Sequence, residues 1–237
     1  RGASSKMTIE TQMRLTRFID IVISFIAIVI LLPFMIPIMI ILKLTGEHYI
    51  FYRQPRVGKG GKDFYVFKFA TMLKDSPNMP GGVLTQKNDP RILPFGRFLR
   101  KTKINELPQL VNILIGQMSF VGPRPQARKH YELYPPEVRE AIDKFRPGLT
   151  GLASMIFRNE SEILDKVDAD RDHFHDTVIA PYKGELELWY SHHCGWRSYF
   201  LLIALTIWVL FRPDDSKAWR HFYHDIPKPP KELEPYL

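Results

Sequence analysis

The hydrophobic pattern of the chain is dominated by one run near its N-terminus. Residues 21–42 read IVISFIAIVILLPFMIPIMIIL, and none of these 22 residues is charged. As a helix the run would be about 33 Å long, which is enough to cross a bilayer core of roughly 30 Å. Pro33 and Pro37 lie near its middle and would kink or break such a helix, because proline lacks the backbone N–H that the helix needs.

Cationic residues flank this run on both sides, so the positive-inside bias indicates no preferred side. They are Arg14 and Arg17 before the run and Lys43, Arg53 and Arg56 after it. Cations at both ends and a break in the middle favour a re-entrant membrane helix-hairpin over 18–44, with both flanks at the anionic cytoplasmic leaflet. A bent helix that spans the bilayer is the alternative.

A second apolar run, 199–211, has 13 residues and is too short to span a bilayer. Trp196, Arg197 and Arg212 flank it, and aromatic rings with arginine stems are typical of helices at the level of the lipid headgroups. The pattern predicts an interfacial helix over 196–212. A buried core helix fits the same pattern equally well.

The remaining polar sequence has the features of a compact domain over 45–237. Residues 49–52 and 64–69 are rich in aromatic and β-branched side chains, and the glycine-rich segment 57–62 joins them, which predicts a short β-hairpin. The expected fold class is therefore α+β, mostly helical. Turns are expected at 76–82, at the start of 89–99, where a short helix follows, and at 121–125.

The segment 101–114 reads KTKINELPQLVNIL, with Asn105 and Glu106 shortly before Pro108. Proline is tolerated in the first turn of a helix, so the sequence predicts a helix with Asn105 as its N-cap. Leu107, Leu110, Val111 and Leu114 would form its apolar stripe. Because cations precede this helix and a helix N-terminus attracts anions, Asn105 and Glu106 can also be interpreted as a catalytic pair.

The charge and the cysteine count restrict the classes of function. The 237 residues carry a formal net charge of +8, which favours nucleic acid, an anionic membrane surface or a phosphorylated substrate as the partner. No nucleic-acid-binding motif supports the first of these. Cys194 is the single cysteine, which excludes an intramolecular disulfide and leaves too few thiols for a structural zinc site.

Several short segments can be set aside. Residues 1–6, RGASSK, are interpreted as a tag remnant before Met7, and 1–17 as this remnant followed by an interfacial segment. The glycines and lysines of 57–62 do not match a phosphate-binding P-loop, and a serine nucleophile elbow is absent from the sequence. His192 and His193 are adjacent and would point apart on any regular element, so they do not indicate a metal site.

Three segments, in this order after the hydrophobic run, carry a resemblance to a known family. They read YRQPRVGKGGKDFYVFKFATM, NDPRILPFGRFLRKTKINELPQLVNILIGQMSFVGPRP and RPGLTGLA. From about residue 14 to residue 206 the chain resembles the bacterial sugar transferases, monotopic phosphoglycosyl transferases that act on polyprenyl phosphate. The resemblance implies a membrane-dipping N-terminal helix and a compact catalytic domain at the cytoplasmic face of the bacterial inner membrane.

The resemblance also implies an activity. Enzymes of this family move a sugar 1-phosphate from a UDP-sugar to undecaprenyl phosphate, release UMP and begin a surface glycan such as lipopolysaccharide or exopolysaccharide. The implied partners are a UDP-sugar, undecaprenyl phosphate and membrane lipid, without nucleic acid. The family uses an adjacent Asp-Glu pair with Mg²⁺, and its Asp is understood to attack the β-phosphoryl group.

Asn105 stands where the family has this Asp, and Glu106 matches the Glu. An amide is a poor nucleophile but its oxygen can ligate Mg²⁺, so Glu106 is the expected catalytic carboxylate and both residues are expected at the metal. Three explanations stay open: Glu106 is the nucleophile, transfer is direct, or the chain is a catalytically impaired, membrane-anchored binder of polyprenyl phosphate or nucleotide sugar. Ala70 is a second departure, because the family commonly has Arg there. The expected substrate-binding cations are Lys68, Arg91, Arg97, Arg100 and Arg124.

Overall fold

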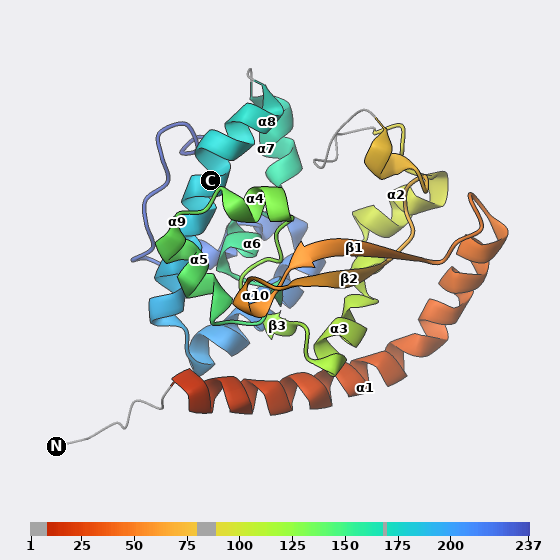
Figure 1. Ribbon diagram of the computed structural model, residues 1–237, viewed down its shortest axis with the longest axis horizontal. Coiled ribbons are helices and arrows are strands. Elements are labelled where there is room, and N and C mark those ends of the chain that lie inside the picture. Colours follow the sequence, from red (N-terminus) through yellow and green to blue (C-terminus); the bar gives the residue numbers. More distant parts are fainter. Residues whose placement is uncertain (1–8, 80–88, 168–169) are drawn as a thin grey trace.

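The computed structural model describes residues 9–79, 89–167 and 170–237. The expected tag remnant at 1–6 lies outside these residues, as does the end of the expected turn at 76–82. The described chain is mostly helical with two small sheets, which confirms the α+β class. In Figure 1 the long helix α1 runs along one side of the molecule, the β1–β2 hairpin crosses its middle, and most of the later helices gather at one end of the hairpin.

The short strands all lie in the first two thirds of the chain, and the last third is helical. In chain order the elements are α1 (Ile9–Leu44), β1 (Phe51–Val57), β2 (Asp63–Phe69), α2 (Pro94–Lys101), α3 (Gln109–Ile115), β3 (Ser119–Val121), α4 (Arg128–Glu132), α5 (Pro136–Asp143), β4 (Gly148–Thr150), α6 (Leu152–Ile156), α7 (Glu160–Lys166), α8 (Arg171–Phe174), α9 (Ala180–His193) and α10 (Trp196–Phe211). Two short turns also matter for the site: the 3₁₀ turn η3 (Ile104–Glu106) and the π-helical turn η4 (His175–Ile179).

Helix α1 is continuous over 36 residues and bends in its second half, where Pro33 and Pro37 lie (Figure 1). A hairpin of two helices would require a break near these prolines. The helix is bent there but it is not divided into two. Phe18, Phe25 and Phe34 are 64%, 58% and 68% exposed, so the helix leaves a broad apolar face uncovered. Its length and hydropathy suffice to cross a membrane. Entry and exit on the same membrane face stay a prediction.

Two polar side chains join the N-terminal half of α1 to the rest of the fold. The guanidinium of Arg17 donates to carbonyl oxygens in the last turn of α3, including that of Leu114 at 2.6 Å. The carbonyl of Ile113 also accepts a backbone hydrogen bond from Gly116 at 3.1 Å. The last carbonyls of a helix lack partners in the following turn, so Arg17 adds to the hydrogen bonding at the C-terminal end of α3. The carboxylate of Asp20 accepts hydrogen bonds from the Tyr199 hydroxyl at 2.7 Å and from the backbone N–H of Phe120 at 3.1 Å. Helix α1 therefore lies along the body of the protein.

The predicted β-hairpin is confirmed, with a first strand that extends further than expected. Strands β1 and β2 pair antiparallel, with Phe51 opposite Phe69 and Val57 opposite Asp63. The sequence predicted only 49–52 for the first strand, because the charged and proline residues that follow disguise its alternation. This longer strand brings Arg56 into the same sheet as the aromatic segment of β2.

Asn112 joins α3 to the open edge of β2. Its side chain is fully buried. Its Oδ1 accepts a hydrogen bond from the backbone N–H of Phe67 at 2.9 Å, and its Nδ2 donates to the carbonyl oxygen of Tyr65 and to Oε1 of Gln117, both at 2.8 Å. Because β2 has a partner strand on one side only, these bonds supply its other edge with the partners that a third strand would provide.

The helix predicted to begin at Asn105 begins later. Residues Ile104–Glu106 form the single turn η3, and α3 begins at Gln109, directly after Pro108. Pro108 has helical dihedral angles, φ −61° and ψ −15°, and no described side chain caps the helix, so the prediction of Asn105 as N-cap is wrong. The predicted apolar stripe is also wrong in part, since Val111 is 38% exposed.

Two glycines allow the parallel strands β3 and β4 to approach closely. A Cβ added at Gly122 would lie 2.3 Å from the carbonyl oxygen of Arg146, and one at Gly148 would lie 2.2 Å from the backbone nitrogen of Gly122. Such distances exclude any side chain at either position. The contact holds the start of the turn at 121–125 against the neighbouring segment and thereby positions Arg124.

Helix α10 confirms the predicted second apolar helix and combines the two interpretations of it. Leu202 and Val209 are fully buried in the core, whereas Phe200, Trp208 and Phe211 on the other side are 47%, 48% and 82% exposed. One face is thus a core face. The other is an apolar surface of the kind found on interfacial helices.

The contacts of Arg17 and Asp20 lead to a prediction about membrane topology. Because these side chains hold the start of α1 against the body, a cysteine introduced by Arg14→Cys should lie on the same side of the membrane as one introduced by Lys59→Cys in the hairpin turn. Both variants are to be made in a Cys194→Ala background and labelled with a membrane-impermeant maleimide in vesicles of known orientation. Labelling of the two positions from opposite sides would contradict the re-entrant arrangement.

Candidate active site

An open cavity of about 960 Å³ lies between the hairpin, η3, the turn at 121–125 and helices α6 and α7. It is lined by six of the seven residues that the sequence singled out, namely Lys68, Arg91, Arg100, Asn105, Glu106 and Arg124. Arg97 lies on an exposed part of α2 and is not among the described residues of the lining. The fold therefore brings most of the predicted site to one surface.

Glu106 lies within a group of cations. Its Oε1 is 3.9 Å from Nζ of Lys68 and 4.0 Å from Nη2 of Arg124. Burial alone would raise the pKa of Glu106, but Lys68, Arg124, Lys103 and Arg100 outweigh this effect and hold the pKa below its ordinary value. Glu106 is therefore an ionised carboxylate, and its side chain is 22% exposed.

The backbone before Glu106 adopts an uncommon conformation. Lys103 has φ 61° and ψ 7°, in the left-handed region that residues other than glycine rarely enter. Its carbonyl oxygen accepts a hydrogen bond from the backbone N–H of Glu106 at 3.1 Å, which closes η3. Such outliers gather at functional sites, and this one turns the chain so that Glu106 and Lys103 share one group of charges.

Lys68 is the cation of β2 that faces Glu106. Burial lowers the pKa of Lys68 to about 8; Glu106 acts in the opposite direction, and the cations Arg124, Arg56 and Arg100 lower the pKa further. Burial and the charge of Arg124 likewise lower the pKa of Arg56 to about 10. The site thus contains more positive charge than its own carboxylate balances, which favours binding of an anion.

Arg124 is held through its backbone. It lies between Pro123 and Pro125, which restrict the chain on both sides. Its backbone N–H donates to the carboxyl group of Glu187, a buried residue of α9 whose pKa burial raises to about 7. The guanidinium remains 45% exposed. The turn predicted at 121–125 thus places the guanidinium beside Glu106, 4.0 Å from its Oε1.

Arg91 and Arg100 line the same cavity with different partners. Arg91 is 3% exposed, and its guanidinium forms two bonds to the carboxylate of Asp89, at 2.9 and 2.7 Å, with a third to the carbonyl oxygen of Ser76 at 3.2 Å. These bonds make Arg91 a support for the loop that leads into α2. Arg100 donates to the Thr71 hydroxyl at 3.4 Å, and burial lowers its pKa.

Asn105 is buried beside Glu106, at 6% exposure, and its Oδ1 has no hydrogen-bond partner among the described residues. An unpaired buried acceptor costs free energy, on the order of 1–3 kcal/mol, unless it meets a donor or a cation. An amide oxygen next to a carboxylate is a donor set that suits Mg²⁺, which typically takes one or two carboxylates plus substrate phosphates. The residues present therefore fit the metal that the family resemblance implies.

Several residues that line the cavity could not be predicted from the sequence. Arg56 is indicated there only as a flank of the apolar run, and Arg158, Glu160 and Lys183 have no distinctive signal. Lys183 donates to Oε2 of Glu160 at 2.6 Å, so this pair adds a partly buried carboxylate to the cavity wall. Arg56 lies in β1, Arg158 in a turn, and Glu160 and Lys183 in helices; in the sequence each is a single charge that looks the same as a solvent-exposed one.

Comparison with known proteins places this geometry in a family. The profile of the bacterial sugar transferases matches residues 11–213, which is most of the chain. The chain belongs to the bacterial sugar transferase family. The match includes α1, the hairpin, η3 and the turn that carries Arg124, so the resemblance drawn from the three sequence segments is confirmed.

Curated relatives of this bacterial sugar transferase have names that specify substrates. The chain is 37% identical over 155 residues to a UDP-glucose:undecaprenyl-phosphate glucose-1-phosphate transferase from Klebsiella pneumoniae, covering 64% of this chain and 33% of that protein. It is 42% identical over 146 residues to the exopolysaccharide production protein PSS of Rhizobium leguminosarum bv. phaseoli, covering 60% and 73%.

A third relative differs in its sugar. A UDP-N-acetylgalactosamine-undecaprenyl-phosphate N-acetylgalactosaminephosphotransferase from Aeromonas hydrophila is 35% identical over 142 residues, covering 59% of this chain and 33% of that protein. This bacterial sugar transferase thus spans about a third of the length of the Klebsiella and Aeromonas relatives. The names of the Klebsiella and Aeromonas relatives agree on undecaprenyl phosphate and differ in the sugar, whereas the name of the Rhizobium relative specifies neither.

The lowered pKa of Lys68 predicts a pH dependence of nucleotide binding. Protonated Lys68 attracts an anion and the neutral form does not, so the affinity for UMP should fall as the pH rises through about 8. The phosphate of UMP is already dianionic above about pH 7, so its own titration does not contribute. Isothermal titration between pH 7 and pH 9 should show a loss of roughly tenfold, the size expected for one charge-assisted hydrogen bond. Lys68→Met should bind weakly at every pH, and a similar fall with pH in this variant would exclude Lys68 as the cause.

Proposed function

We propose that this protein transfers a sugar 1-phosphate from a UDP-sugar to undecaprenyl phosphate and releases UMP. The observation that carries the proposal is the ionised carboxylate of Glu106, which faces an open cavity and is surrounded by Lys68, Arg124, Lys103 and Arg100. Both substrates are anionic, and the surplus of cations is suited to hold their phosphates close to one carboxylate. The family and the substrates named for its relatives support the same reaction.

The proposed location is the cytoplasmic face of the bacterial inner membrane. Undecaprenyl phosphate keeps its phosphate at the headgroup level, so an enzyme that uses it needs a membrane-bound site. Helix α1 leaves Phe18, Phe25 and Phe34 uncovered, and α10 exposes Trp208 and Phe211. These apolar surfaces support membrane association, and the positive charge of the chain suits an anionic leaflet.

In the proposed reaction Glu106 is the nucleophile. One carboxylate oxygen attacks the phosphorus that carries the sugar, the bond from this phosphorus to the bridging oxygen breaks, and UMP leaves with that oxygen. An oxygen of undecaprenyl phosphate then attacks the same phosphorus and restores the free carboxylate of Glu106. Lys68 and Arg124, both about 4 Å from the carboxylate, are placed to balance the negative charge on the phosphoryl oxygens.

Asn105 has a supporting part in this proposal. Its buried Oδ1 and a Glu106 oxygen are the donors that would hold Mg²⁺ together with the diphosphate. When bound, the metal would neutralise charge on the diphosphate and on the departing UMP. The amide cannot take over the nucleophilic role, which leaves that role to Glu106.

The second candidate function is a membrane-anchored binder of polyprenyl phosphate or nucleotide sugar without turnover. The observation that favours it is the neutral Asn105 beside Glu106. The cavity and its cations would serve this function equally well, because binding needs no nucleophile. Lipid-dependent release of UMP separates the two functions.

Replacing the carboxylate tests the central assignment. Glu106→Gln keeps the size of the side chain and removes its charge, so UMP release from a UDP-sugar in the presence of undecaprenyl phosphate should fall by at least about a thousandfold. Glu162→Gln, at an exposed position of α7, is the matched control and should keep wild-type activity. UMP production should be measured with a panel of UDP-sugars. Full activity of Glu106→Gln would show that Glu106 is not the nucleophile.

Asn105→Asp adds a second carboxylate at the position where relatives of this family are expected to carry one. UMP release should rise, and rapid quenching with a sugar-labelled substrate should trap labelled protein, because a carboxylate attack forms an acyl phosphate. If neither the present chain nor Asn105→Asp releases UMP from any UDP-sugar, the protein is a binder. Turnover without labelled protein in either chain would indicate direct transfer.

The geometry of Arg124 predicts that its guanidinium cannot be replaced by an ammonium group. Arg124→Lys keeps the charge but removes the planar pair of donors, so activity should fall by roughly tenfold or more, which corresponds to about 1.5–3 kcal/mol for a charge-assisted hydrogen bond. Arg53→Lys is the control, since Arg53 is exposed on β1 outside the described lining of the cavity. Equal activity of both variants would assign Arg124 to the support of its turn alone.

A further inference from the structure

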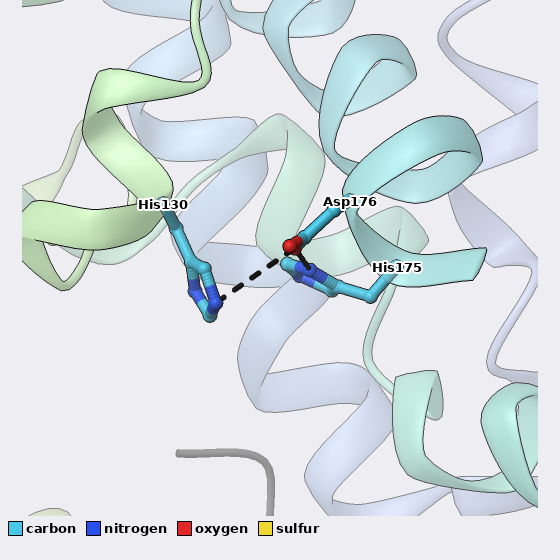
Figure 2. Close-up of side chains that lie close together, drawn as sticks. All are labelled: His130, His175 and Asp176. Carbon is cyan, nitrogen blue, oxygen red and sulfur yellow. Dashed lines mark hydrogen bonds and ion pairs between the residues drawn. The ribbon is translucent and has the colours of Figure 1, made fainter. Parts of the chain in front are cut away.

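His130, His175 and Asp176 form a compact cluster that the proposed reaction does not use. Figure 2 shows the two imidazole rings and the carboxylate directed toward one another from α4 and η4, which are separated by more than 40 residues of chain. His130 and His175 are 8% and 3% exposed, and their ring centroids are 4.6 Å apart. One ligating atom of each of the three residues lies within 4.8 Å of the others.

We propose that His130, His175 and Asp176 bind a divalent transition-metal ion of the Zn²⁺ class. Two imidazoles and one carboxylate are a ligand set that such ions accept, with a fourth position left for water. This site is separate from Asn105 and Glu106, and the proposal does not depend on the proposed function.

The distances in the cluster are close to those of a coordination sphere. Oδ1 of Asp176 lies 3.9 Å from Nε2 of His130 and 2.8 Å from Nδ1 of His175. Two ligands bound at about 2.0–2.1 Å to a tetrahedral ion lie about 3.3 Å apart, which is between these two values. Movements of about half an ångström would therefore bring Oδ1 of Asp176 to the ligand spacing from each imidazole, and all three ligand atoms already lie within 4.8 Å of one another. The hydrogen atom that joins His175 to Asp176 lies where the ion would bind, so binding would displace it.

The local backbone explains how two adjacent residues can serve one site. His175 and Asp176 begin the π-helical turn η4, which interrupts the regular helical geometry between α8 and α9. Turns of this kind are rare and frequently occur at functional sites. In this turn the carboxylate of Asp176 bends back to its neighbour's ring, which the regular spacing of an α-helix would not favour.

A second carboxylate supports the ring of His175 from behind. Nε2 of His175 lies 3.4 Å from Oε1 of Glu160, whose other oxygen accepts a hydrogen bond from Lys183 at 2.6 Å. Metal-bound histidines commonly direct their second ring nitrogen at a carboxylate, which orients the ring and increases its basicity. Nδ1 is thereby left as the nitrogen that faces Asp176.

The cation Lys129 lies beside Asp176, and its ammonium group would have to move when a metal binds. Nζ of Lys129 is 3.8 Å from Oδ2 of Asp176, and its side chain is 62% exposed. A long exposed side chain of this kind can turn into solvent at little cost, because a surface ion pair contributes little to stability. Oδ1 of Asp176 remains directed at the two imidazoles. A bound ion would join α4 to η4 in the wall of the cavity, which His130 and His175 both line.

Cobalt provides the direct test, because Co²⁺ replaces Zn²⁺ and absorbs visible light. The full-length protein in detergent micelles, without other metals, should bind one equivalent of Co²⁺ with visible bands of four- or five-coordinate geometry and no thiolate charge-transfer band. Added Zn²⁺ should displace the cobalt and raise the melting temperature. His130→Gln and Asp176→Asn should each weaken Co²⁺ binding by at least about tenfold.

Three controls locate the ion. The double variant His192→Gln/His193→Gln removes two exposed histidines at the end of α9 and should leave Co²⁺ binding unchanged, as should Cys194→Ala and Glu106→Gln. X-ray absorption of the cobalt-loaded wild-type protein should show two imidazoles and only nitrogen or oxygen ligands, a result that does not depend on the folding of any variant. The proposal is overturned if the wild-type protein fails to bind one equivalent, if its spectrum shows no imidazole, or if a control variant removes the ion.

Discussion

The arrangement of the candidate site depends on the bonds that Asn112 makes to the edge of β2. A two-stranded sheet leaves backbone groups of its outer edges without partners, and the amide of Asn112 satisfies two of them on β2, at Tyr65 and Phe67. Because both bonds come from one rigid amide, they fix the position of α3 along the strand. Lys68 is the next residue on β2 and Glu106 lies one turn before α3, so the same bonds bring these two charges within 3.9 Å.

The site that results has more positive charge than negative charge. Several cations, most of them partly buried, converge on Glu106, and the lowered pKa values of Lys68 and Arg56 reflect the cost of holding these charges together. A protein tolerates such a cost when an anion compensates for it in the working state, since each phosphate oxygen can accept charge-assisted hydrogen bonds. The support is built outside the cavity: Glu187 holds the backbone of Arg124, and Asp89 holds Arg91.

The secondary-structure elements could be predicted from the sequence more reliably than the contacts between side chains. Alternating aromatic residues revealed the hairpin, and the two apolar runs revealed α1 and α10, because these patterns follow from burial alone. The prediction of Asn105 as the N-cap was wrong because Pro108 itself adopts helical dihedral angles and α3 begins directly after it. The expectation that Arg91 binds substrate stays a prediction; its two bonds to Asp89 could not be predicted, because a charge in the sequence does not disclose its partner. The cluster of His175 and Asp176 could not be predicted, because a π-helical turn produces no periodic pattern of hydrophobic residues in the sequence.

The neutral Asn105 is best understood from the atom that it leaves unpaired. If the residue were only structural, its buried Oδ1 would be expected to accept a hydrogen bond, as the amide of Asn112 does a few residues later. Among the described residues, this oxygen has no hydrogen-bond partner. A group that enters with the substrate, a hydrated cation or a hydroxyl, would supply one. In the proposed reaction the diphosphate would therefore lie on the side of the cavity where this oxygen is unpaired, next to the carboxylate of Glu106.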